Sequence, residues 1–68
     1  MTVLDSTTNN DIVIALIDRH TKISRFVVAW DYDDDRGEWS QGHYFETITT
    51  AVDYFNANYR QTPDNEQE

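Results

Sequence analysis

The sequence predicts an α+β domain in which a three-stranded antiparallel meander is followed by one C-terminal α-helix. Two observations indicate the sheet: apolar, β-branched runs at 11–18 and 23–32, and the short polar segments that follow them. A third observation, apolar residues that recur with helical spacing after residue 47, indicates the helix. A chain of 68 residues has room for one domain only.

The first predicted strand covers 11–18, where three isoleucines and a valine favour a strand over a buried helical segment. A polar turn leads to the second strand, 23–32, and the Asp-rich segment 33–37 turns the chain again. Gly37 can take the positive φ of a type I turn followed by a bulge. The third strand runs from about 38 to 45. Because the connections are short, an antiparallel meander is the simplest topology.

The helix is predicted from Thr47 to about residue 61. Its apolar residues fall at i, i+3, i+4, i+7 and i+11, which is an amphipathic pattern. They are Ile48, Ala51, Val52, Phe55 and Tyr59. Thr47 can cap the helix through its hydroxyl, and Pro63 lies just beyond the expected end. The helix packs on one face of the sheet.

The domain boundaries follow from where apolar residues stop. Residues 1–10 are polar and rich in Thr and Asn, and we expect a flexible N-terminal segment there. Residues 11–61 form the single small domain. Residues 62–68 carry no apolar side chain apart from the proline ring, which predicts a disordered acidic tail.

The second strand is apolar in both phases of its alternation. Phe26, Val28 and Trp30 occupy one phase, and Val27 and Ala29 occupy the other. A strand with one face in water would alternate apolar and polar residues, so both faces need cover. One helix covers one face, and we therefore expect apolar surface to remain exposed in a monomer. This predicts a homodimer, formed through the sheet or its edge.

The register of the third strand depends on the length of the turn that precedes it, since a slip of one residue exchanges the faces. We favour the register in which alternate residues from Trp39 onward share the face of Phe26, because Phe45 then lies beside the start of the helix. Those residues are Trp39, Gln41, His43 and Phe45. The alternative register, which starts from Ser40, stays open.

The net charge of −8 arises from thirteen acidic and five basic residues. A chain this acidic repels phosphate backbones and anionic membrane surfaces, so we expect neither direct nucleic-acid binding nor membrane binding. The longest apolar run, 12–17, is far shorter than the roughly 20 residues that span a bilayer. The N-terminus has no basic region and no long apolar region, so no signal peptide is predicted and we expect a cytoplasmic protein.

The segment 31–35, Asp-Tyr-Asp-Asp-Asp, suggests a calcium loop. The match fails by position, because Arg36 stands where the calcium loop needs glycine and Gly42 stands where it needs the closing Glu. We interpret the segment as a solvated hairpin turn, with weak calcium binding as the alternative. His20 and His43 have no metal-ligand spacing, and no serine lies in a nucleophile motif. We predict no catalytic residue, no cofactor, no metal and no enzyme activity.

The density of aromatic residues is the last informative feature. A cysteine-free core that gains area from large rings explains most of it. The alternative is a recognition surface, and Tyr54 is its best single candidate because this residue lies off the apolar stripe of the helix. The residues predicted to bind a partner are Trp30, Tyr32, Asp33, Asp34, Asp35, Trp39 and Tyr54.

We therefore expect a small acidic, non-enzymatic protein-interaction module that forms homodimers and binds an unidentified protein. The alternative is an inhibitor of phage or plasmid type that imitates nucleic acid and blocks a nuclease or DNA-binding protein. No motif identifies a family. A short acidic chain with a Trp-rich hairpin and a terminal helix has the general appearance of small bacterial or mobile-element proteins.

Overall fold

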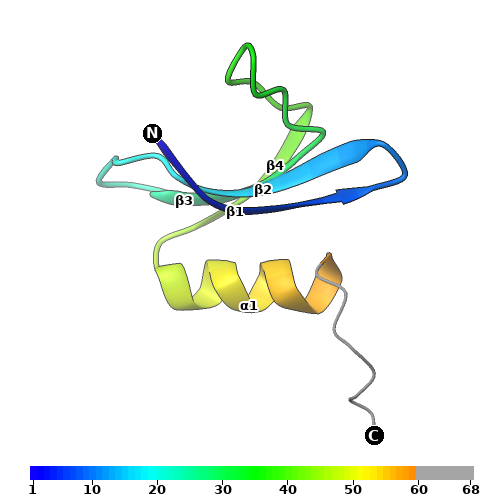
Figure 1. Ribbon diagram of the computed structural model, residues 1–68. Helices are drawn as coiled ribbons and strands as arrows, with labels where there is room; N and C mark the ends of the chain where they lie inside the picture. The colour runs from blue at the N-terminus through cyan, green and yellow to red at the C-terminus, as the bar shows by residue number, and fades with distance from the viewer. Residues whose placement is uncertain (60–68) are drawn as a thin grey trace, which may run out of the picture.

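The computed structural model describes residues 1–59, which form a four-stranded antiparallel sheet with one helix on one of its faces (Figure 1). The strands lie side by side in chain order, and the helix follows the last strand. The elements are β1 (Thr2–Asn9), β2 (Ile12–Asp18), β3 (Phe26–Trp30), β4 (Gln41–Phe45) and α1 (Ile48–Asn58). The α+β class, the meander and the C-terminal helix on the sheet are confirmed, whereas the prediction of three strands is wrong.

The additional strand is β1, which comes from the first ten residues, where we expected a flexible segment. It pairs with β2 through a two-residue turn in which Asn10 and Asp11 both have positive φ, 52° and 67°. Asn and Asp tolerate this conformation better than most residues, so the turn forms without glycine. A bulge at Leu4 shifts the register between Val3 and Asp5.

Strand β3 is shorter than predicted at both ends, Phe26–Trp30 rather than 23–32, and β4 is shorter at its start. β3 begins at Phe26 rather than at Ile23, which is 75% exposed in the preceding turn. The positive φ of Ser24, 51°, interrupts the extended backbone there. β4 begins at Gln41 rather than at residue 38, because the chain between the two strands leaves the sheet and keeps only one isolated bridge to itself.

The register of β4 is the one that the sequence favoured. Phe45, His43 and Gln41 lie opposite Phe26, Val28 and Trp30 and share their face of the sheet. The placement of Trp39 on that face was wrong. Trp39 precedes the regular strand, and its side chain packs against the opposite face of the sheet.

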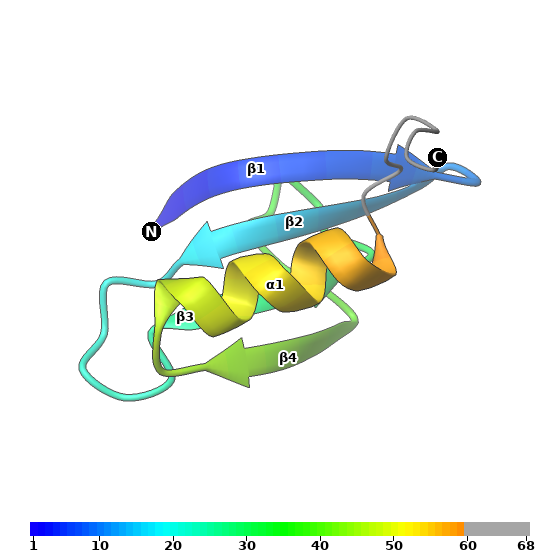
Figure 2. The same cartoon turned by 90° about the horizontal axis from the view of Figure 1, so that it is seen from below.

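The helix covers the face of the sheet that holds Phe26. Figure 2 shows α1 lying across the sheet on this side. Its buried residues, Ala51 and Phe55, complete a core with alternate residues of β2 and β3. Those residues are Ile14, Leu16, Phe26 and Val28. The predicted cap is confirmed, since Thr47 Oγ1 accepts a hydrogen bond from the Thr50 amide at 3.3 Å. The helix ends at Asn58, with Tyr59 as its C-cap, rather than near residue 61 as predicted. The predicted tail, 62–68, lies outside the described residues.

The opposite face of the sheet is also covered, and the cover comes from the chain itself. Ala15, Ile17, Val27 and Ala29 are each 0% exposed. They lie beneath the loop between β3 and β4, which arches over the sheet on the side away from the helix (Figure 1). The expectation that this face is exposed in a monomer was therefore wrong. An uncovered sheet face is no longer a reason to expect a dimer.

Candidate interaction surface on the β3–β4 loop

The loop between β3 and β4, residues 31–40, is held in a defined conformation by one aspartate. The Asp33 carboxylate accepts hydrogen bonds from the amides of Asp35, at 3.0 Å, and Arg36, at 3.3 Å. The Asp33 backbone carbonyl accepts from the Gly37 amide at 2.7 Å, and the Asp33 amide donates to the Glu38 carbonyl at 2.7 Å. Gly37 has φ +66°, as the sequence predicted. Asp33 therefore builds the turn rather than facing solvent freely.

A second set of contacts fixes the base of the loop to the sheet. Asp31 has a positive φ of 63°, which turns the chain out of β3. Its carboxylate accepts a hydrogen bond from the Ser40 hydroxyl at 2.9 Å, and the Ser40 amide donates to the Trp30 carbonyl at 3.1 Å. The Tyr32 amide donates to the Val13 carbonyl of β2 at 2.8 Å. Both ends of the loop are thus bonded to the sheet.

The underside of the loop is aromatic. The rings of Tyr32 and Trp39 lie 6.3 Å apart and pack on the second face of the sheet. The indole of Trp39 donates to the Tyr44 hydroxyl at 3.3 Å. It also lies over Gly42, where an added Cβ would come within 3.0 Å of the indole nitrogen and 2.8 Å of a Val27 methyl group. A side chain at this position would therefore have to displace the Val27 methyl group or the indole, which explains the glycine.

The outer side of the loop carries the charge. Asp34 and Asp35 are exposed, and their carboxylates make no hydrogen bond or ion pair with the part of the chain that the structure describes. Only Arg36 offsets them, and its Nε lies 3.9 Å from the Asp33 carboxylate. Five carboxylates between residues 31 and 38 therefore face a single guanidinium on a loop that cannot easily rearrange.

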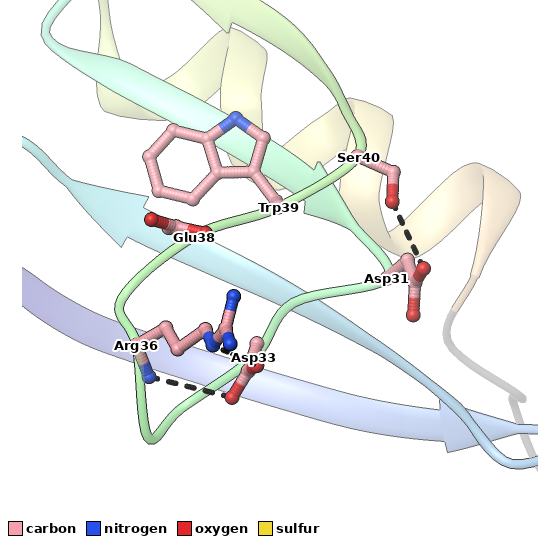
Figure 3. A pocket seen from close by; sticks show the side chains of 6 residues that line it. All are labelled: Asp31, Asp33, Arg36, Glu38, Trp39 and Ser40. Atoms are coloured by element: carbon pink, nitrogen blue, oxygen red, sulfur yellow. Dashed lines mark hydrogen bonds and ion pairs between the residues drawn. The ribbon is translucent and has the colours of Figure 1, made fainter.

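A shallow hollow of about 250 Å³ lies between the two sides of the loop (Figure 3). Asp31 and Ser40 are bonded together at one side of it, and Asp33 and Arg36 approach each other at the other. Within residues 1–59 no three acidic, histidine or cysteine side chains are arranged to hold a metal ion. The Asp33 carboxylate, which a cation site here would use, already accepts two backbone hydrogen bonds.

The residues predicted to bind a partner do not form one surface. Five of them belong to the loop. The rings of Tyr32 and Trp39 lie on its inner side, and the aspartates at 33–35 lie on its outer side. Trp30 lies on the other face of the sheet, half-buried against the core under the helix. Only the loop residues are brought together.

Tyr54 is also not the free aromatic ring that the helical pattern suggested. It is half-buried, and its ring lies 4.7 Å from His43, 5.4 Å from Phe45 and 6.0 Å from Tyr59. Burial raises the pKa of Tyr54, and its hydrogen bond with Tyr59 adds to the effect. The side of the helix that carries Tyr54 packs over β4, so the ring belongs to the core.

Exposed apolar side chains along β1 were not predicted from the sequence. Met1, Val3, Leu4 and Ile48 are all exposed, and the last two line a groove beside the helix. The apolar pair Val3-Leu4 was a signal in the sequence, but it carried no weight while the segment was expected to be flexible.

Comparison with known proteins does not assign the chain: no protein-family model, no curated protein and no solved structure matches it. Within residues 1–59, α1 is too short and too polar to cross a membrane. The geometry of the chain itself therefore carries the functional argument.

Proposed function

We propose that the protein is a non-enzymatic protein-interaction module whose β3–β4 loop contacts a positively charged surface of another protein. One observation carries this proposal: the loop presents carboxylates to solvent from a backbone that is already fixed. A preorganised loop loses little conformational entropy on binding, and its charge steers a basic partner toward it.

The exposed charge is not used inside the molecule. Asp33 and Asp31 hold the loop together, but Asp34 and Asp35 have no such role among the described contacts. Two unpaired carboxylates at the tip of a loop repel each other and their neighbours, and a basic partner would relieve that repulsion.

The arrangement of hydroxyl groups and histidines also supports a non-enzymatic role. Ser40 donates to Asp31, which orients the hydroxyl but supplies no imidazole base. His20 lies in the turn between β2 and β3, and His43 packs against Tyr54 on the helix side of the sheet. Neither histidine is at the loop.

The alternative proposal, an inhibitor that imitates nucleic acid, uses the same loop with a different partner. Clustered carboxylates replace phosphates, and the partner is then a nuclease or another DNA-binding protein. The net charge of −8 on a chain of 68 residues supports this alternative. The class of the captured protein separates the two proposals.

A pull-down from host lysate with two matched variants tests the role of the loop. Asp34→Asn/Asp35→Asn removes two exposed charges from the loop, whereas Asp11→Asn/Asp53→Asn removes two exposed charges elsewhere and leaves the same net charge. We expect the loop variant to bind a basic partner at least about tenfold more weakly, and the control variant to bind like the wild type. Binding should also weaken as salt rises. Equal binding by both variants would refute a specific role of the loop.

We further propose that the protein forms homodimers, now on grounds other than an uncovered sheet face. The support is the exposed apolar surface along β1, described above. Sedimentation equilibrium over a wide concentration range tests this part of the proposal independently of the pull-down.

A further inference from the structure

The outer edge of β1 is open. β1 is the longest strand of the sheet, with eight residues, and no described residue pairs with it on the side away from β2. Proteins commonly protect such edges with proline, lysine or short strands. β1 contains no proline and no basic residue; its protection consists of one bulge and one charge, Asp5.

The exposed apolar residues are concentrated at this edge. Four of the six large apolar side chains exposed in the described chain lie on β1 or beside it: Met1, Val3, Leu4 and Ile48. Leu4 is 42% exposed and Ile48 is 47% exposed. The surface is therefore not a random scatter of apolar side chains.

Apolar residues flank the edge on both faces of the sheet. On the helix side, α1 packs over β2, β3 and β4 but does not reach β1 (Figure 2). The gap is a groove of about 440 Å³ lined by Leu4, Leu16, Ile48 and Val52 among others. On the loop side, Val3 lies opposite Ile17 and belongs to the other face.

We propose that β1 pairs antiparallel with β1 of a second copy, which joins the two sheets into one of eight strands. This inference rests on the proposed homodimer and names its interface. A strand that docks here must bring apolar side chains to both faces, and β1 itself does so, with Val3 on one face and Leu4 on the other. A two-fold axis perpendicular to the sheet places both helices on the same side, so that each groove faces the other.

The charge of β1 favours a second copy of the chain, rather than a basic peptide, as the strand that pairs with this edge. The chain as a whole carries −8, but β1 carries one charge in eight residues. A nearly neutral strand is the best match for a nearly neutral edge, whereas a basic partner is drawn to the loop at 31–38 instead. The two copies repel at long range, so the dimer should strengthen as salt rises, opposite to binding at the loop.

The small area that one strand edge can bury predicts a weak dimer. A standard interface buries about 800 Å² on each partner, and the whole molecule exposes 4641 Å². One strand with a few flanking side chains offers less than that standard area. We therefore expect a dissociation constant of roughly 10–100 µM rather than an obligate dimer.

Lysine substitutions test the interface by sedimentation equilibrium from about 5 to 500 µM, at low and high salt. Leu4→Lys and Ile48→Lys each place a charge in the groove, and Ile23→Lys makes the same kind of change at an exposed site in the β2–β3 turn. Each lysine lowers the net negative charge, so any general electrostatic effect would favour association. We expect about tenfold weaker dimers for the two groove variants and no weakening for the control.

The outcomes distinguish a failure of the β1 interface from a failure of the proposed homodimer. A wild-type dimer that neither groove variant weakens would refute the β1 interface and leave the homodimer standing. A wild-type monomer at every concentration and salt would refute the homodimer and the β1 interface together, while the loop proposal keeps its own test. Ile48→Lys lies outside the strand, so it decides the matter even if Leu4→Lys does not fold, which circular dichroism shows.

Single cysteines locate the two-fold axis, since the natural chain contains none. Ser6→Cys and Thr7→Cys lie near the middle of β1, and in an antiparallel pair one of them approaches its own counterpart. We expect rapid disulfide formation under mild oxidation for at least one of them, and slow formation for Ile23→Cys. Equally slow oxidation of all three, in a sample that sediments as a dimer, would place the interface elsewhere.

Discussion

At the scale of single residues, the Asp18 carboxylate joins the end of β2 to the turn that follows through three hydrogen bonds. It is 8% exposed, at the end of β2. Its two oxygens accept from Arg25 Nε at 2.8 Å and Nη2 at 2.9 Å, and one of them also accepts from the His20 amide at 2.9 Å. The hydrogen bond from Arg25, with a smaller contribution from the His20 amide, lowers the pKa of Asp18 from 3.8 to about 2, against the opposing effect of burial.

The lowered pKa makes the contribution of Asp18 to stability dependent on pH. The contribution is complete above the unfolded-state pKa near 3.8 and is lost as pH falls toward 2, because the unfolded chain binds the proton more tightly. Asp18→Asn should lower the Tm by several degrees at pH 7. The difference in Tm between the variant and the wild type should then shrink as pH falls from 4 to 2. Denaturant unfolding of both proteins at each pH checks this, and a difference that stays constant down to pH 2 would contradict it.

At the scale of elements, the β3–β4 loop functions as the second layer of the domain. In a small chain, a loop cannot usually replace a helix as cover for a sheet, because its backbone polar groups need partners. Here the amides of Tyr32, Asp33, Gly37 and Ser40 all donate to backbone carbonyls, and Trp39 supplies the apolar area. The loop that we propose as the interaction surface is therefore also part of the core.

This dual role predicts a coupling between Trp39 and Gly42. Gly42→Ala should lower the free energy of unfolding by about 1–3 kcal/mol, because its new methyl group displaces the indole and meets Val27. Trp39→Ala should lower it by roughly 2–3 kcal/mol, because the half-buried ring leaves the second sheet face open.

Urea unfolding of the two single variants and the double variant completes the cycle. We expect Gly42→Ala to lower the free energy of unfolding by less in the Trp39→Ala background than in the wild type. Only the contact with Val27 then remains. Additive effects of the two changes would show that the indole does not pack over Gly42 in solution.

At the scale of the whole molecule, the charge is unbalanced. Most of the basic residues within 1–59 lie in or next to the β2–β3 turn, where Arg25 pairs with Asp18 and Arg19 donates to the Ser24 carbonyl at 2.8 Å. The acidic excess lies on the β3–β4 loop instead. The folded state therefore keeps repulsion that its few ion pairs do not offset.

This imbalance predicts that salt stabilises the monomer. Raising NaCl from about 10 mM to about 150 mM shortens the Debye length from about 30 Å to about 8 Å and screens repulsion among exposed carboxylates. The Tm at a protein concentration of about 5 µM, below the expected dimer range, should rise by a few degrees. The rise should be smaller for Asp34→Asn/Asp35→Asn, and a fall in Tm would mean that ion pairs outweigh the repulsion.

Much of this fold is predictable from local patterns. The β-branched runs predicted β2 and β3, the helical spacing from Ile48 predicted α1 with its Thr47 cap, and Gly37 predicted the turn. β1 was missed because its residues are mostly Thr, Ser and Asn, whose strand formation depends on a neighbour to pair with. The Asn10-Asp11 turn was the available signal, and it is weaker than a turn with glycine.

The candidate site was predictable only in part. The acidic residues at 33–35 were identified from their sequence alone, and they do lie together on one loop. Tyr54 and Trp30 were assigned to the same surface because exposure was inferred from helical and strand spacing. Packing against His43 and the helix-side core removes them from it.

The apolar residues in both phases of β3 were enough to predict burial of both its faces, because Val27 and Ala29 cannot face water beside Phe26 and Val28 without cost. They could not determine what covers the second face. The cover is the chain's own loop, and this depends on contacts between distant residues: the chain turns at Asp31, which has a positive φ, and returns over the sheet with Trp39 above Gly42. Within residues 1–59, the same packing leaves the edge of β1 open, with exposed apolar side chains beside it.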